Sequence, residues 1–347
     1  TSNYERTKRI MAFTTINKST EYFSSDIWSG NSGTQTISAG GQRDMTWFKV
    51  RNGTRVHRLQ DAVRGVTKAL QPNDSAAEGS ETTMITAFNS SGYTTGSDAD
   101  INASGSNYVG WSWKANGAGS ANTNGDIAST VSVNTTSGFS IVSWTANGSN
   151  NATIGHGLSS TPKIVLYKKL NDVDSWYVVY TFVDGTQDYL VLNDTTAKAD
   201  LASGTYGTAT STTISNIGFP NSNSLIAYCF ADVQGYSKFS SYIGNGNADG
   251  TFVYTGFKPA FVMIKATSGT ENWQMYDNKR LGYNVDNNML RANLSNAEQT
   301  DDDIDILSNG FKLRRNSGAF NNSGSTYIYM AIGQSLVGTN NIPNNAR

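Results

Sequence analysis

The side chains best suited to catalysis are scarce in this sequence of 347 residues. It contains two histidines, His57 and His156, and a single cysteine, Cys229. A hydrolytic triad needs an imidazole beside a nucleophile, and a histidine-rich metal site needs several imidazoles together. Neither histidine lies in a motif of that kind, and His156 falls in a Gly-His-Gly turn. We interpret both histidines as structural or surface residues, and we expect no enzymatic activity and no cofactor.

The densest group of carboxylates lies at 300–305, where Asp301, Asp303 and Asp305 follow one another closely. Such acids could supply oxygen ligands to Ca²⁺, although the loop lacks the spacing and the glycine of an EF-hand. The three residues are therefore candidate metal ligands, with a solvated acidic loop as the alternative. No pair of acids is marked out for glycoside hydrolysis, which needs two carboxylates across the bond that is cleaved.

Turn-forming and aromatic residues dominate the composition. Charged residues make up 15% of the chain and hydrophobic residues 37%, with 17 Tyr, 14 Phe and 7 Trp. This mixture is typical of a β-protein with many turns and not of a disordered chain. A net charge of −1 provides no field that would favour nucleic acid. The absence of an 18-residue apolar run argues against membrane insertion.

The sequence repeats itself three times. Each copy contains an apolar strand closed by a lysine, followed by a Leu-x-x-Asn motif. Matching motifs keep one register from copy to copy, which chance similarities would not do. Short apolar runs separated by turn residues predict β-strands within each copy. The lysine-closed strands lie at 45–49, 164–168 and 261–265, and the Leu-x-x-Asn motifs begin at Leu70, Leu190 and Leu290.

We therefore predict an all-β protein of three tandem β-sandwich-like repeats with little helix. Residues 116–136 carry few apolar side chains, so we interpret them as a flexible linker or exposed arm, with repeat 1 hinged. Almost no linker separates repeats 2 and 3, which are expected to pack rigidly. The predicted units are an N-terminal arm at 1–21, repeat 1 at 22–115, the linker at 116–138, repeat 2 at 139–233, repeat 3 at 236–334 and a C-terminal tail at 335–347.

Positions that are apolar in all three copies are predicted to face inward. Cys229 matches Ser112 and Ala331, so it is expected to fill a small packing site and not to act as a nucleophile. The predicted core positions are Phe48, Tyr167 and Ile264 in the lysine-closed strands, and Leu70, Leu190 and Leu290 in the Leu-x-x-Asn motifs.

Several long strings resemble a known family. They are MAFTTINKSTEYF at 11–23, DAVRGVTK at 61–68, GYSKF at 235–239, GTFVYTGFKPA at 250–260, LSNGFKLR at 307–314 and YIYMA at 327–331. They resemble the repeat domain of unknown function found in tail-fibre and other structural proteins of bacteriophages, many of them marine. The resemblance covers nearly the whole chain from Met11 onward. It loosely implies concanavalin-like or lectin-like sandwiches.

The resemblance implies a virion protein, made in the host cytoplasm and carried on the particle surface or tail. We expect a tail-fibre or adhesin head that attaches to the host cell surface, with surface carbohydrate as a candidate ligand. The alternative is a capsid decoration, head-fibre or appendage building block with a purely structural role. Expected partners are further copies of the chain in a homo-oligomer, a trimer among the candidates, and other virion proteins. A carbohydrate-active enzyme is the third reading.

Binding specificity is expected where the copies differ, because the fold explains what they share. The loops at 199–213 and 300–305 differ most. The candidate ligand-binding residues are Tyr206, Trp176 and Trp273.

The N-terminal ten residues lie outside the first repeat and carry a local charge of +2. They lack an apolar pattern for a core of their own, and we predict that they contact a neighbouring subunit by strand addition or charge pairing. An arm folded back on repeat 1 is the alternative. The candidate assembly residues are Tyr4, Arg6, Lys8 and Arg9.

Overall fold

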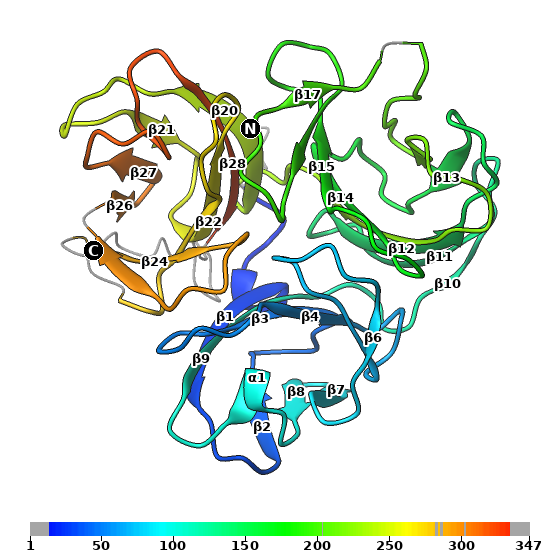
Figure 1. Ribbon diagram of the computed structural model, residues 1–347, viewed down its shortest axis with the longest axis horizontal. Helices are drawn as coiled ribbons and strands as arrows, with labels where there is room; N and C mark the ends of the chain where they lie inside the picture. Colours follow the sequence, from blue (N-terminus) through cyan, green and yellow to red (C-terminus); the bar gives the residue numbers. More distant parts are fainter. Residues whose placement is uncertain (1–13, 203, 282–283, 285–286, 302, 334–347) are drawn as a thin grey trace, which may run out of the picture.

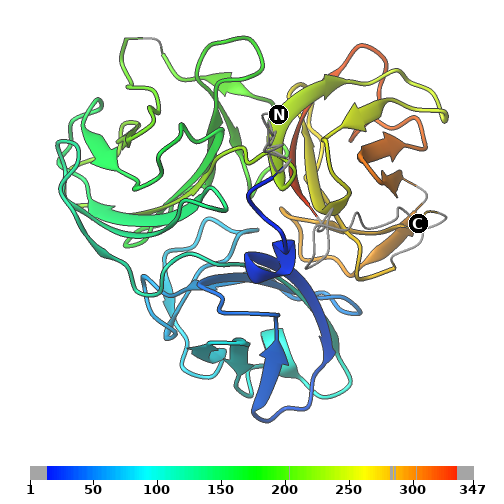
Figure 2. The ribbon, with the colours of Figure 1, turned by 180° about the vertical axis from the view of Figure 1, so that it is seen from behind.

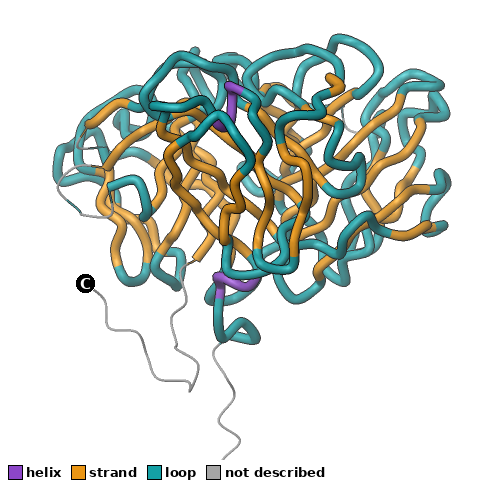
Figure 3. Tube along the Cα trace, turned by 90° about the horizontal axis from the view of Figure 1, so that it is seen from below, coloured by secondary structure: helices purple, strands orange, loops and turns teal. Residues whose placement is uncertain are grey.

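The computed structural model describes residues 14–202, 204–281, 284, 287–301 and 303–333. The described part is almost entirely antiparallel β-structure, with one four-residue α-helix, α1 (Ala99–Asn102), and one 3₁₀ turn, η1 (Ser19–Glu21). In Figure 3, the body consists of strands and the loops that join them, and the two short helices lie on opposite sides of it. No helix in the described residues is long and apolar enough to cross a membrane.

Repeat 1 contains a principal sheet and a facing sheet. The principal sheet has the order β1 (Phe23–Ser29), β9 (Asn107–Trp113), β3 (Met45–Val50) and β4 (Arg58–Asp61). The facing sheet has the order β2 (Gln35–Ser38), β8 (Gly92–Thr95) and β7 (Ile85–Asn89). A ribbon of β5 (Lys68–Ala69) and β6 (Gly79–Ser80) continues from β4 through a bridge between Leu59 and Leu70.

Repeat 3 has the same arrangement. Its principal sheet has the order β20 (Ser237–Ile243), β28 (Thr326–Gly333), β22 (Pro259–Ala266), β23 (Gln274–Asp277), β24 (Asn287–Arg291) and β25 (Gln299–Asp301). Its facing sheet has the order β21 (Phe252–Tyr254), β27 (Gly310–Leu313) and β26 (Ile304–Leu307).

Repeat 2 keeps this order and adds two strands. Its principal sheet runs β10 (Ser120–Asn122), β11 (Ser129–Asn134), β12 (Phe139–Thr145), β19 (Ser224–Phe230), β14 (Ile164–Lys169), β15 (Tyr177–Tyr180), β16 (Asp188–Val191) and β17 (Ala199–Asp200). The facing pair is β13 (Thr153–Gly155) with β18 (Thr213–Ser215). The predicted all-β fold of three sandwich-like repeats is confirmed.

Each sandwich encloses its own small core, as alternation along the strands predicts. Phe48, Tyr167 and Ile264 lie in three separate clusters between the sheets of repeats 1, 2 and 3. Their predicted burial is confirmed, and so is that of the three motif leucines, which point the other way. Leu70, Leu190 and Leu290 are all buried in one large cluster.

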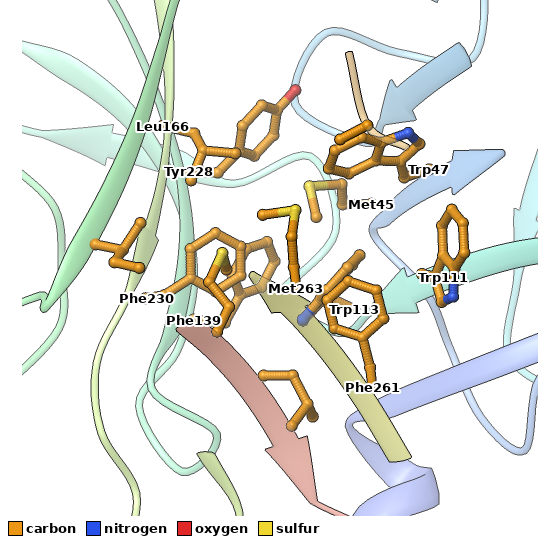
Figure 4. Packing of buried hydrophobic residues seen from close by; sticks show 14 of the residues in the cluster. Met45, Trp47, Trp111, Trp113, Phe139, Leu166, Tyr228, Phe230, Phe261 and Met263 are labelled. Atoms are coloured by element: carbon orange, nitrogen blue, oxygen red, sulfur yellow. The ribbon is translucent and has the colours of Figure 1, made fainter. Parts of the chain in front are cut away.

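That large cluster is a central core shared by all three repeats. Figure 1 shows three lobes around a common centre, and Figure 4 shows side chains from all of them meeting there. The Trp113 ring of repeat 1 lies 6.3 Å from Phe139 and 6.0 Å from Phe230 of repeat 2. It also lies 6.1 Å from Phe261 of repeat 3. The expectation of a hinged repeat 1 is therefore wrong, because its largest side chains are packed into both neighbours.

The interpretation of 116–138 as a flexible linker is also wrong. β10 and β11 lie in this range and extend the principal sheet of repeat 2. Val131 is buried against the core of that repeat, and Val133 packs beside it. The alternating Thr-Val-Ser-Val run makes a strand because its valines fall on apolar surface that the isolated segment lacks.

Candidate functional site

Two of the candidate ligand-binding residues are structural. Trp176 and Trp273 are 0% and 1% exposed, so neither can contact a ligand on the surface. Trp176 Nε1 donates to the carbonyl oxygen of Gln71 in repeat 1 at 3.0 Å. Trp273 Nε1 donates to the carbonyl oxygen of Val191 in repeat 2 at 2.9 Å. The prediction of these tryptophans as ligand contacts is corrected: a large amphipathic ring with one donor suits a buried boundary.

His57 completes the set at the third boundary. Its Nε2 lies 3.0 Å from the carbonyl oxygen of Arg291 in repeat 3, while its Nδ1 accepts from Trp47 Nε1 at 2.8 Å. Arg291 occupies the motif position of Gln71 and Val191, so the three contacts form a closed ring around the centre. Burial, together with nearby Lys49, lowers the pKa of His57 to about 3. The imidazole is therefore neutral, and its structural role is as the sequence indicated.

Backbone hydrogen bonds form a second closed ring at matching positions. In each bond the donor is the backbone N–H eight residues after the motif leucine of one repeat. The acceptor is the backbone carbonyl two residues after the strand lysine of another repeat. The bonds run from Glu78 N to Leu170 O (2.8 Å), from Lys198 N to Thr267 O (2.8 Å) and from Glu298 N to Arg51 O (2.7 Å). Because every repeat donates once and accepts once, no pair of repeats can separate without breaking a backbone hydrogen bond.

Two of the three strand lysines also donate across a boundary between repeats. Lys49, Lys168 and Lys265 are fully buried, and burial lowers the pKa of each to about 8. Lys168 Nζ donates to the carbonyl oxygen of Ser75 in repeat 1, and Lys265 Nζ to that of Thr195 in repeat 2. A buried ammonium needs such acceptors to offset its lost hydration. Packing between repeats thus explains two of these perturbed amines, whereas Lys49 Nζ donates to the carbonyl oxygens of Val50 and Gly53 in its own repeat.

A buried ion pair lies at the boundary between repeats 1 and 2. Arg64 Nε donates to Asp61 at 2.6 Å, and Arg64 Nη1 to Glu78 at 3.1 Å. Tyr228 of repeat 2 donates its hydroxyl to the same Asp61 at 2.7 Å. The carboxylate is therefore held by its own repeat and by the neighbouring one.

The boundary between repeats 3 and 1 has the same design. Arg280 Nε donates to Asp277 at 2.6 Å, and Arg280 Nη1 to Glu298 at 3.1 Å. Trp111 of repeat 1 donates its Nε1 to Asp277 at 2.9 Å. Burial alone would raise the pKa of Asp277, but Arg280 and the hydrogen bonds hold it below its ordinary value.

The acidic residues proposed as metal ligands are paired with arginines. Arg315 contacts Asp301 at 3.4 Å and Asp303 at 2.5 Å, and Arg314 contacts Asp305 at 3.3 Å. Asp303 also accepts the Tyr276 hydroxyl at 2.7 Å. The guanidinium groups stand where a cation would have to bind. These three acids are not brought together as ligands, and the solvated-loop alternative also fails for the buried Asp303.

A different acidic group lies in repeat 2. Asp184, Asp188 and Asp200 converge within ligand distance of one another. Lys198 Nζ, however, donates to all three at 2.9 Å. The ammonium already supplies the positive charge, so the cluster is an ion-pair network.

Cys229 and His156 are buried in repeat 2. Cys229 pairs with Ser140 and Val165 at the register position that Ser112 and Ala331 occupy elsewhere, as the sequence comparison indicated. Burial raises the pKa of its thiol to about 12, which suppresses the reactive thiolate. His156 Nδ1 accepts from the Leu158 backbone N–H at 3.1 Å.

The remaining candidates divide in two. Tyr206 is half-buried beside Gly218 and stays a prediction as a ligand contact. The assembly residues Tyr4, Arg6, Lys8 and Arg9 lie outside the described residues.

A groove beside β1 of repeat 1, lined also by residues of repeat 3, is a concave surface that sequence reasoning missed. The groove has a volume of about 700 Å³ and lies between β1 and β2, the outer strands of the two sheets. Asp26 and Trp28 line it from β1, and Lys279 of repeat 3 lies at its rim. Asp26 accepts the Ser24 hydroxyl at 2.7 Å, and burial raises its pKa to about 6. We call this surface the β1–β2 groove.

The family model described as Domain of unknown function (DUF7483) matches residues 18–335. The chain belongs to this family. No curated protein matches it.

The DUF7483 match runs through all three repeats and through β10 and β11 between them. One family unit therefore coincides with one body built around a shared core. The sequence signal that could have predicted this is the recurrence of an aromatic or imidazole donor at His57, Trp176 and Trp273. Side chains that recur at a repeat boundary are expected when each copy packs against the next.

Proposed function

We propose that this DUF7483 chain is a non-enzymatic bacteriophage virion protein, the head of a tail fibre or adhesin that attaches to the host cell surface. The strings at 11–23, 250–260 and 307–314 support a virion origin, because they resemble repeats of phage structural proteins. Further support comes from the use of both histidines, the cysteine and the strand lysines in packing. A protein head that binds a surface is expected to need a rigid fold and no reactive side chains.

The observation that carries the attachment proposal is an exposed aromatic pair on repeat 3. Phe252 is 44% exposed and Tyr254 is 57% exposed, both on β21, the outer strand of a facing sheet. Lys238 Nζ lies 5.8 Å from the centre of the Tyr254 ring. Flat, rigid rings beside a hydrogen-bond donor suit an amphipathic ligand such as a surface glycan. The pair replaces the buried tryptophans as the candidate contact.

The test is adsorption of purified protein to cells of the host of the parent phage. Phe252→Ala and Tyr254→Ala together should reduce adsorption about tenfold or more. Val173→Ala is the matched control, because Val173 is an exposed apolar residue at 64% exposure in another repeat. Equal adsorption by both variants would remove this surface from the proposal. Absence of the protein from purified particles, tested by immunogold electron microscopy, would remove the virion assignment.

A structural building block of the capsid or an appendage is the second candidate. The outer edge of β1 favours it, because β1 has no strand partner there among the described residues, and an unpaired strand edge can accept another chain. Particles lacking the protein distinguish the two roles. Loss of assembly indicates the structural role, and normal particles that no longer adsorb indicate attachment.

A further inference from the structure

The seam between the two sheets of a sandwich is closed in repeat 2. β11 pairs with residues 139–144 of β12, and β12 is followed on its other side by β19 in the principal sheet. Just before β11, Gly125 and Ile127 form bridges to Ile154 of the facing sheet. The segment 125–134 thus joins the edges of both sheets, and its own Ile127 and Val131 side chains are buried in the core of repeat 2.

The equivalent seam of repeat 1 is the β1–β2 groove. β1 is the counterpart of β12, since Phe23 pairs with Trp113 as Phe139 pairs with Phe230. Residues 14–22, the described part of the chain before β1, do not fill the groove, although Ser19 and Thr20 line it. Ile16 is 3% exposed in the central core, and Figure 2 shows this part of the chain where the three lobes meet. Within the described residues, repeat 1 therefore has the walls of the seam and no segment that closes it.

The backbone of β1 is oriented to receive a strand. Gly30 N–H donates to Ser106 O, so every second residue back from Gly30 faces β9. The backbone groups of Ser25 and Ile27 consequently point to the outer edge, where β1 has no strand partner among the described residues. The buried Ser25 hydroxyl also lines the groove without a hydrogen-bond partner in the described structure. Both features are open donors or acceptors at the wall.

We propose that the β1–β2 groove accepts an extended segment of another protein chain, which adds to β1 as β11 adds to β12. Main-chain hydrogen bonds would supply affinity, and alternate side chains would enter the seam. The inference uses the fold alone and does not depend on the proposed virion function.

The register in repeat 2 specifies the chemistry of the occupant. Val131 lies opposite Val142, whose counterpart in β1 is Asp26. The residue facing Asp26 is therefore expected to be cationic or a hydroxyl, where repeat 2 uses valine. Ser129 lies opposite Trp144, the counterpart of Trp28. A small residue is therefore expected in the occupant, two positions before the residue that faces Asp26.

The edge of β1 in a second copy does not suit the groove. That strand is flanked by β2 and η1 of its own body, which would have to enter the seam with it. A free segment of one strand's width does not have this difficulty. The occupant is thus assigned to an extended segment of a different protein.

The probe is a fluorescein-labelled peptide with the sequence of 125–134, compared with its Val131→Lys and Val131→Glu forms. Fluorescence anisotropy with the full chain should show the Lys form binding at least tenfold more tightly than the Glu form. Asp26→Asn should abolish that preference while keeping the fold. Fusing the Lys form to the C-terminus through a Gly/Ser linker raises its effective concentration to the order of mM. Hydrogen exchange at the Ser25 amide should then slow at least tenfold.

Ile27→Pro and Ser241→Pro form a matched pair. Ser241 is the counterpart of Ile27 on β20, the outer strand of repeat 3. Proline removes the outward N–H in each case, so only Ile27→Pro should abolish peptide binding and Ser25 protection. Unchanged exchange in the tethered protein, or equal loss in both proline variants, would overturn the proposal. Self-association of the wild type that Ile27→Pro removes would assign the groove to a second copy and overturn the assignment to a different protein.

Discussion

The boundary between repeats 2 and 3 differs in chemistry from the other two boundaries. Where those have Asp61 or Asp277, repeat 2 has Tyr180, and where they have an arginine three residues later, it has Val183. Where Trp111 and Tyr228 donate, repeat 3 presents Met330. At this boundary Tyr180, Val183 and Met330 stand where the other boundaries have an aspartate, an arginine and an aromatic hydrogen-bond donor.

The difference shows that the geometry of the boundary does not depend on the ion pair. A buried ion pair offsets its own desolvation at best, and a well-packed apolar set can replace it. Removing one member is a different matter, because the other charge is left buried and unpaired. Lys198, at the position of Glu78 and Glu298, reverses the charge of the rim and pairs with acids of its own repeat.

The largest expected effect follows from breaking one polar boundary. Asp277→Ala removes the acceptor of Trp111 and leaves the buried Arg280, with 0% side-chain exposure, only Glu298 as a carboxylate partner among the described residues. The free energy of unfolding should fall by about 3–5 kcal/mol, measured by urea denaturation.

Tyr180→Phe is the control at the apolar boundary. The Tyr180 hydroxyl is buried and has no hydrogen-bond partner in the described structure. The variant should change stability by about 0.5 kcal/mol or less. A loss equal to that of Asp277→Ala would show that the two boundaries do not differ as described.

Truncating a motif leucine tests the shared core. Leu290→Ala should cost about 2–5 kcal/mol, because the side chain is 1% exposed in the central cluster. Leu190→Ala, at the matching position, should cost a similar amount in the same unfolding measurement. A cost near zero for either leucine would contradict the assignment of these positions to one common core.

Acid should weaken the boundary that uses His57. Burial lowers the pKa of His57 to about 3, whereas an unfolded imidazole titrates near 6.5. As pH falls below 6.5, the unfolded chain gains a proton that the folded chain does not. Stability should therefore fall by about 1.4 kcal/mol per pH unit on account of this residue.

His57→Gln isolates the contribution. Comparing the free energy of unfolding of wild type and variant between pH 6 and pH 4 cancels the titration of other groups. Parallel curves would mean that His57 is protonated in the folded protein.

The smallest effect concerns the asparagine of each Leu-x-x-Asn motif. Asn193 Oδ1 accepts the backbone N–H of Trp176 at 2.9 Å, and Asn293 does the same for Trp273 at 3.0 Å. Asn193→Ala leaves that N–H unsatisfied and should cost about 1–2 kcal/mol by urea denaturation. Asn193→Asp keeps the acceptor and should cost less. The opposite order would indicate that the side chain acts through its NH₂ group.

The sequence by itself determined that the chain contains three copies, that each copy consists of β-strands, and which strand positions face inward. Phe48, Tyr167 and Ile264 could be placed because period-two alternation is a local property of the chain. The alignment of the copies also shows that His57 occupies the position of Trp176 and Trp273, and that Cys229 occupies a position held by small residues in the other copies. These assignments need only the spacing of residues along each strand and the register between copies.

Only the tertiary structure decided how the three copies meet. Burial of Trp176 and Trp273, the pairing of Asp303 with Arg315 and the closed rings of hydrogen bonds all depend on contacts between distant segments. The valines at 131 and 133 became a strand because β12 offered an edge, which composition could not reveal. The β1–β2 groove likewise depends on tertiary contacts. Before β1, Ile16 packs in the shared central core, whereas before β12 residues 125–134 pair with the edges of both sheets of repeat 2.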